Sequence, residues 1–164
     1  MYEECRKANV EYARTFDRSK LAMPPAKHLA IVACMDARLT VEEFLGLRTG
    51  DAHIIRNAGG LATEDAIRSL IISTHLLGTR EIIVVNHTDC GMLTFQEDAV
   101  RQQLREKFGA DAAGLALMPF SDLHANVREQ VRKIRECPFI PKEYPIFGTI
   151  YHVESGELEE VCRL

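Results

Sequence analysis

The chain has 164 residues, 46% of them hydrophobic, and its 20 basic and 24 acidic residues give a formal net charge of −4. This length and composition suit one domain with a single buried core, which we expect to span residues 1–164. Acidic and basic residues are interleaved without a basic stripe, so nucleic acid and anionic membranes are not expected partners. No apolar run approaches the roughly 20 residues of a membrane helix, and residues 1–20 are too polar for a signal peptide, so we expect a cytoplasmic protein.

The first predicted element is a polar segment, residues 2–17, in which apolar side chains recur at the spacing of one helical face. This pattern predicts an amphipathic helix. The Pro24-Pro25 pair prevents the helix from continuing, so we expect residues 1–24 to form an arm that precedes the core.

Strands are predicted next at three apolar runs rich in β-branched residues, each short enough to be buried on both faces of a sheet. They are residues 28–35, 52–57 and 81–87. Four helices are predicted between and after these strands. They are a short helix that begins at the capping-box pattern of Thr40, a helix from Thr63 that stops at Gly78, and helices over 96–108 and 121–136. The alternation predicts an α/β fold with a mostly parallel central sheet flanked by helices, closed by a C-terminal strand or hairpin around Ser155-Gly156.

Three potential metal ligands lie at the ends of predicted strands. Cys34 is near the end of one strand, His87 ends another, and Cys90 follows His87 in a turn. The carboxyl ends of parallel strands meet at one edge of a sheet, so these side chains can converge. Two sulfurs and one nitrogen suit zinc, and three protein ligands with an open fourth position are typical of a catalytic site. The His-x-x-Cys spacing alone is a weak pattern that packing residues also produce, and Cys34 at a matching strand end strengthens it.

Asp36 and Arg38 follow Cys34 and are two residues apart, so both can project to the same side, where a guanidinium holds a carboxylate bidentately. As a mere surface pair they would contribute little to stability. Beside a metal, Arg38 would keep Asp36 ionised while Asp36 accepts a hydrogen bond from a metal-bound water. A cysteine-phosphatase loop needs Arg six residues after the cysteine, and that position is Thr40, so this chemistry is excluded.

The other cysteines and histidines are expected to lie outside the site. The chain has five cysteines, which cannot all pair, and we expect reduced thiols because there is no export signal. The small buried or surface thiols are Cys5, Cys137 and Cys162. The histidines expected to be structural or surface residues, none of which can be ranked as a proton shuttle, are His28, His53, His75, His124 and His152. Asp89 is expected only to accept a hydrogen bond in its turn.

The motifs "CMDARL", "RNAGG" and "HTDCGM", with Cys34 and His87 separated by 53 positions, resemble the β-class carbonic anhydrases. The resemblance extends over most of the chain and is to short, compact members such as those of mycobacteria and archaea. It implies a zinc ion bound by Cys34, His87 and Cys90, with Asp36 and Arg38 as the catalytic pair, and reversible hydration of CO2. It also implies that the "RNAGG" loop approaches the active site and that the N-terminal arm crosses to a second subunit, giving a homodimer or a dimer of dimers.

Three alternatives remain open at this point. Asp36 can displace the water as a conditional fourth zinc ligand, which predicts an enzyme inactive at low pH and active at alkaline pH. Carbonyl sulfide and carbon disulfide hydrolases share this fold and these ligands, so the motif does not fix the substrate. A zinc protein with a closed site of four ligands would have no catalytic activity.

Overall fold

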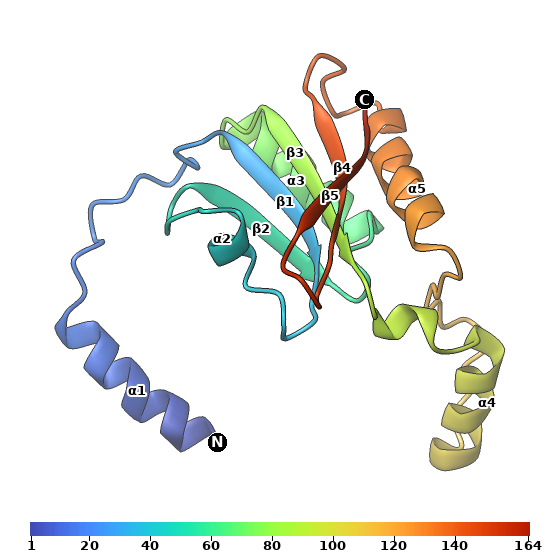
Figure 1. Cartoon of the computed structure of the whole chain (residues 1–164). Coiled ribbons are helices and arrows are strands. Elements are labelled where there is room, and N and C mark those ends of the chain that lie inside the picture. The colour runs from blue at the N-terminus through green and yellow to red at the C-terminus, as the bar shows by residue number, and fades with distance from the viewer.

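The computed structural model describes all 164 residues and contains one five-stranded sheet in the order β2-β1-β3-β4-β5 (Figure 1). The strands are β1 (Leu29–Cys34), β2 (Ala52–Asn57), β3 (Glu81–His87), β4 (Ile146–Tyr151) and β5 (Leu158–Arg163). β1, β2, β3 and β4 run parallel, and β5 pairs antiparallel with β4. The predicted α/β class, with a mostly parallel sheet and a C-terminal hairpin, is confirmed.

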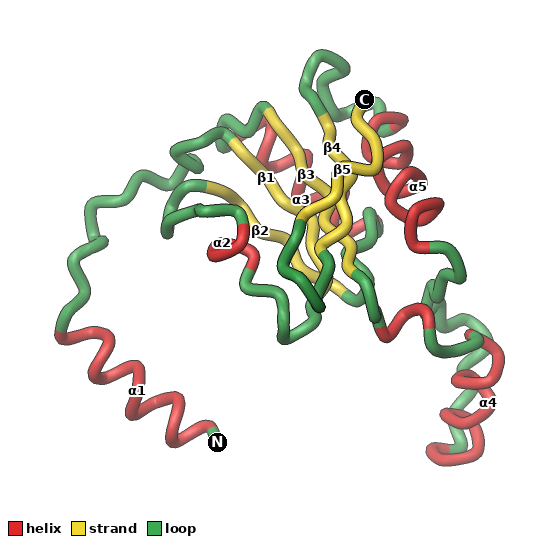
Figure 2. The backbone as a smooth tube through the Cα atoms, viewed as in Figure 1, coloured by secondary structure: helices red, strands yellow, loops and turns green.

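Helices cover both faces of this sheet, and two of them extend away from it (Figure 2). They are α1 (Tyr2–Arg14), α2 (Val41–Phe44), α3 (Glu64–Leu76), α4 (Glu97–Phe108) and α5 (Leu123–Glu136), with a short 3-10 helix, η1 (Gly91–Leu93). Neither α1 nor α4 has a buried residue, and both lie away from the sheet (Figure 1). No helix combines the length and the apolar character needed to cross a membrane.

The core consists of two apolar clusters, one on each face of the sheet, because alternate side chains of a strand point to opposite faces. In β1, Ala30 and Val32 pack with Leu70 of α3 and Val131 of α5 on one face. On the other face, β1 packs against Val41 of α2 and the segments that flank it. All six residues of β1 are buried, which explains why its sequence is uniformly apolar.

Two helix ends differ from the sequence-based expectation. The N-terminal helix ends at Arg14 rather than continuing to residue 17. The capping box predicted at Thr40 is not formed, because the Thr40 hydroxyl donates to the Glu43 carboxylate at 2.9 Å instead of accepting from a backbone N–H. Thr63 does cap α3, since its hydroxyl accepts from Ala66 N at 3.3 Å.

The "RNAGG" loop after β2 crosses the carboxyl ends of β1 and β3 at very close range. A Cβ atom placed on Gly60 would lie 2.9 Å from both the Cys34 nitrogen and the Val85 oxygen, and Gly60 has a φ of +61°. Asn57 holds the loop by accepting from Leu61 N at 2.7 Å and donating to Leu61 O at 2.8 Å. The close approach to the strand ends, which the family resemblance implies, is present.

Gly60→Ala is expected to reduce the free energy of unfolding by about 2–4 kcal/mol, because the methyl group meets backbone atoms and the residue keeps a left-handed conformation. Gly109→Ala is the matched control: Gly109 has a φ of +65° but no atom within 4 Å of its Cβ position. The left-handed conformation alone should lower the free energy of unfolding of that control variant by about 1 kcal/mol. Urea denaturation of both variants measures the difference, and equal losses would show that the close contact at Gly60 does not matter.

Candidate metal centre

Cys34, His87 and Cys90 converge at the carboxyl edge of the sheet. Cys34 is the last residue of β1 and His87 the last residue of β3, and these two strands pair directly in parallel. Cys90 follows in a turn, in which Asp89 adopts a left-handed φ of 53°. One ligand atom from each of the three side chains lies within 4.8 Å of the other two, and all three residues are buried. The structure therefore brings together the side chains that the sequence selected.

The His87 imidazole is oriented so that one ring nitrogen faces the two sulfurs without a hydrogen bond. Its Nδ1 donates to the Thr88 carbonyl oxygen at 2.8 Å, which leaves the lone pair on Nε2. Nε2 is the only buried side-chain nitrogen or oxygen in the chain that has no hydrogen-bond partner. Leaving such an atom unsatisfied costs about 1–3 kcal/mol, and coordination to a metal ion removes that cost. The donor set, two sulfurs and one nitrogen, fits Zn²⁺.

The two thiols have opposite pKa shifts because they share one proton. A hydrogen bond from the Cys90 thiol, against the opposing effect of burial, lowers the pKa of Cys34 to about 4. The same hydrogen bond to Cys34, together with burial, raises the pKa of Cys90. Burial alone would lower the pKa of His87, but Cys34, the Thr88 carbonyl and the Asp36 carboxylate together outweigh it and the pKa is raised. Both sulfurs must be deprotonated to coordinate a metal, so metal binding releases the proton that the two thiols share.

Asp36 lies beside the three ligands in a fixed orientation. Arg38 donates to Asp36 Oδ1 from Nε and from its backbone N–H, both at 2.9 Å, and to Oδ2 from a terminal nitrogen at 2.8 Å. The side-chain bonds from Arg38 hold the pKa of Asp36 well below its usual range. Asp36 Oδ2 lies 3.9 Å from His87 Nε2, so one carboxylate oxygen faces the position where a metal would be bound. The bidentate pair predicted from the sequence is present.

Two further charged residues contact this edge, and sequence reasoning did not assign either to the site. Arg56 in β2 donates to the Cys34 carbonyl at 2.9 Å and to the Asp36 carbonyl at 2.6 Å, which fixes the backbone between them. Asp89 Oδ2 accepts from Arg38 at 2.7 Å. The position of Arg56 at the end of a strand was an available signal, whereas the contact of Asp89 spans 51 positions and depends on the folded loops.

The remaining histidines all make contacts away from the three ligands. His28 bonds to the Gly78 carbonyl, His53 to Ser73 and His75 to the Phe139 carbonyl. His124 and His152 share the Glu159 carboxylate, each at 3.0 Å. Cys5, Cys137 and Cys162 also lie outside the ligand cluster.

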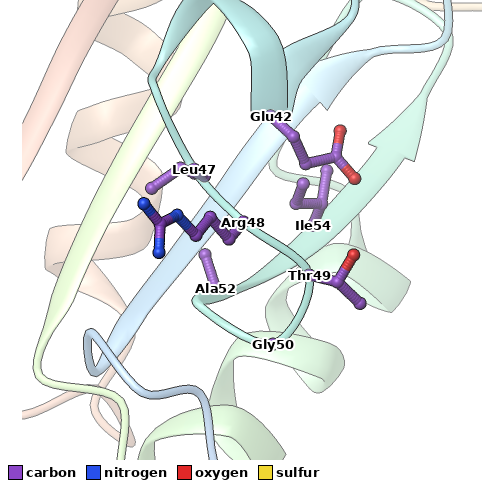
Figure 3. Close-up of a pocket in the computed structure, with 7 residues that line it drawn as sticks. All are labelled: Glu42, Leu47, Arg48, Thr49, Gly50, Ala52 and Ile54. Atoms are coloured by element: carbon purple, nitrogen blue, oxygen red, sulfur yellow. The ribbon is translucent and has the colours of Figure 1, made fainter. Parts of the chain in front are cut away.

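A pocket of about 280 Å³ lies elsewhere, against the beginning of β2 (Figure 3). Its lining includes Glu42 from α2, Arg48 and Thr49 from the loop before β2, and Ala52 and Ile54 from β2 itself. Ala52 is the first residue of β2, whereas Cys34 and His87 are the last residues of β1 and β3, so this pocket lies toward the opposite end of the parallel strands from the ligand cluster.

Residues 29–158 match the family described as carbonic anhydrase. The chain is also 48% identical over 153 residues to "Beta-carbonic anhydrase 1" of Mycobacterium tuberculosis (strain ATCC 25618 / H37Rv), with 93% of each chain covered. The chain belongs to the β-carbonic anhydrase family. The crystal structure of a carbonic anhydrase from Streptococcus mutans superposes with a TM-score of 0.94 at 43% identity and covers 98% of this chain and 97% of that one.

A carbon disulfide hydrolase of Acidithiobacillus thiooxidans is a more distant relative of this β-carbonic anhydrase. It is 39% identical over 161 residues, with 86% of this chain and 80% of that enzyme covered. The resemblance drawn from the three short motifs is thus confirmed over nearly the whole chain, and the comparison favours carbonic anhydrases over the sulfur hydrolases.

Metal-free protein is expected to bind one Zn²⁺ with an affinity that rises with pH, because Cys90 must be deprotonated before it can coordinate. Cys90→Ser should weaken binding by more than about 100-fold, since losing a direct ligand exceeds the 10–100-fold cost typical of losing a supporting group. Competition with a chromophoric chelator between pH 6 and 8 measures both effects. Cys137→Ser, a thiol outside the cluster, is the control, and an equal loss of affinity in both variants would contradict the assignment.

Proposed function

We propose that this chain catalyses the zinc-dependent, reversible hydration of CO2 to bicarbonate, with Cys34, His87 and Cys90 as zinc ligands. The observation that carries the proposal is the unpaired Nε2 of His87, which faces two thiols and has a rigidly held carboxylate oxygen 3.9 Å away. Membership of the β-carbonic anhydrase family supports the reaction and its class as a lyase.

The protein's part in this reaction is to hold the zinc ion and to orient the water that reacts with CO2. When bound, zinc supplies a Lewis acid that makes water a nucleophile near neutral pH. Asp36, kept ionised by Arg38, would accept a hydrogen bond from that water and so orient it toward CO2. Arg56 holds the backbone carbonyls of Cys34 and Asp36, which keeps the first ligand and the orienting carboxylate at a constant separation.

The same arrangement bears on whether Asp36 itself becomes a fourth ligand. Arg38 donates three hydrogen bonds of 2.8–2.9 Å to Asp36, two to Oδ1 and one to Oδ2, so a metal coordinated by Oδ2 would compete with a bidentate ion pair for the same carboxylate. We therefore propose the open site, with Asp36 on Arg38, as the resting arrangement. This arrangement supports turnover and disfavours a closed, non-catalytic zinc site.

Asp36→Asn and Arg38→Ala are each expected to lower kcat/KM for CO2 hydration by roughly 10–100-fold, because either change removes the oriented carboxylate. Stopped-flow hydration with a pH indicator measures the rates on zinc-loaded protein. Asp65→Asn is the control, because Asp65 forms an ion pair of 2.8 Å with Arg68 on the exposed surface and should leave kcat/KM unchanged.

Hydration too slow to detect in wild-type protein that holds stoichiometric zinc would contradict the proposed reaction. Hydrolysis of carbon disulfide or carbonyl sulfide by the same preparation would then assign the chain to the sulfur hydrolases. Full activity in Asp36→Asn would leave the reaction intact and remove Asp36 from it.

We also propose that the chain assembles with a second copy through its N-terminal arm, as a homodimer or a dimer of dimers. The α1 helix has no buried residue, and its apolar side chains Val10 and Tyr12 are 50% and 51% exposed. The Tyr12 ring lies 5.7 Å from that of Phe16, itself 48% exposed, so these two rings form an apolar surface without a partner in one chain.

Tyr12→Asp is expected to shift the protein toward monomer at micromolar concentration, because it places a charge in this apolar surface. Sedimentation velocity measures the shift. Glu11→Gln changes the adjacent position, where the side chain instead pairs with Arg14, and should leave the assembly unchanged. A wild-type protein that sediments as a monomer up to high concentration would overturn the proposed dimer.

A further inference from the structure

Arg38 has a second acidic partner, Asp89, which lies between two of the proposed zinc ligands in the sequence. One terminal nitrogen of Arg38 donates to Asp89 Oδ2 at 2.7 Å, and the other donates to the Asp89 carbonyl at 3.0 Å. The guanidinium therefore bridges the loop that follows β1 and the turn that follows β3. Nothing in the hydration reaction as described above uses Asp89.

The two carboxylates occupy different edges of the guanidinium. Asp36 takes Nε and one terminal nitrogen, while the side chain of Asp89 takes the other terminal nitrogen. A guanidinium has five N–H groups in a fixed plane, so both partners can be bound at once. Asp89 is therefore an additional anchor for Arg38 and does not displace Asp36 from it.

Asp89 is itself fixed by the turn that carries His87 and Cys90. Its φ of 53° is uncommon for a residue other than glycine, although aspartate tolerates this conformation better than most residues. The preceding residue, Thr88, accepts from His87 Nδ1 through its carbonyl and donates its hydroxyl to Glu154 at 2.6 Å. The contact of Arg38 with Asp89 therefore links the orientation of Asp36 to the turn that carries two of the proposed ligands.

We propose that Asp89 is a positioning residue for CO2 hydration: by anchoring the far edge of Arg38, it holds Asp36 in register with the ligand turn. The proposal rests on the function proposed above. The Asp89 side chain is 76% exposed and that of Arg38 is 46% exposed, so their ion pair contributes little to the stability of the fold. Its effect is instead on the freedom of the guanidinium, and through it on the direction of the Asp36 carboxylate.

Two substitutions separate the side chain of Asp89 from its backbone. Asp89→Gly removes the carboxylate and adopts the left-handed φ without strain. Asp89→Asn keeps a hydrogen-bond acceptor and tolerates the same φ, so it removes only the charge. Asp65→Asn is the matched control, because Asp65 pairs with Arg68 at 2.8 Å and is 75% exposed, close to the geometry and exposure of Asp89.

In zinc-loaded protein, Asp89→Gly is expected to lower kcat/KM for CO2 by about tenfold, the lower end of the effect of removing a supporting group. Asp89→Asn should have a smaller effect, and Asp65→Asn none. A second readout does not depend on activity: NMR measures the rate at which the Arg38 Nε–H exchanges with water, with the resonance assigned by its absence in Arg38→Lys. This exchange should be faster in Asp89→Gly than in wild type, with Asp89→Asn between them.

Zinc content and the thermal midpoint should be unchanged in all three variants. Wild-type exchange and wild-type kcat/KM in Asp89→Gly would overturn the proposal, as would equal losses of activity, zinc and thermal stability in both Asp89 variants. A wild-type enzyme without CO2 hydration would instead overturn the proposed function, and in that case the Nε–H exchange rates alone would decide whether Asp89 holds Arg38.

Discussion

The direct parallel pairing of β1 with β3 is the constraint on which the rest of the site depends. Its register places Ala33 opposite Val85, so Cys34 and His87 reach the same edge of the sheet one and two residues later. Both strands are buried, which brings a thiol and an imidazole into a region where polar atoms need partners. The unpaired Nε2 of His87 is the consequence, and a metal ion is the partner that fits two sulfurs and a nitrogen.

The surrounding edge is otherwise fully satisfied, which makes the one exception informative. Asn86, which precedes His87, donates to the Gly59 carbonyl at 2.9 Å and accepts from Asn126 at 2.7 Å. Gln130 donates to Asn126 at 2.8 Å and accepts from Ala62 N at 2.9 Å, so the same buried network reaches the backbone two residues after the "RNAGG" segment. A buried network with every member paired fixes one arrangement of its elements. The loop that contains Gly60 is therefore held in one arrangement against the strand ends that carry Cys34 and His87.

The sequence alone predicted those elements and side-chain positions that follow from the residue's own segment of the chain. The uniformly apolar β1 and the β-branched runs of β2 and β3 gave these strands within one residue, and Cys34, His87 and Cys90 followed from the way parallel strands end together. It failed where a role depends on a partner far along the chain. Asp89 contacts Arg38 across 51 positions and Arg56 contacts Cys34 across 22, and no local pattern around Asp89 or Arg56 names these partners, although the place of Arg56 at a strand end was a signal for the site itself. The capping box at Thr40 is absent because its hydroxyl donates to the Glu43 carboxylate and does not accept from a backbone N–H.

The three buried ligand side chains link this site to folding. The folded chain holds one imidazole nitrogen, Nε2 of His87, without a hydrogen bond. The unfolded chain would expose this nitrogen to water at no such cost. A metal that binds the folded state satisfies all three ligands at once and so adds its binding free energy to that of folding. The stability of this sheet edge would therefore be coupled to the ion, whereas the exposed ion pair of Arg38 with Asp89 contributes little to the fold.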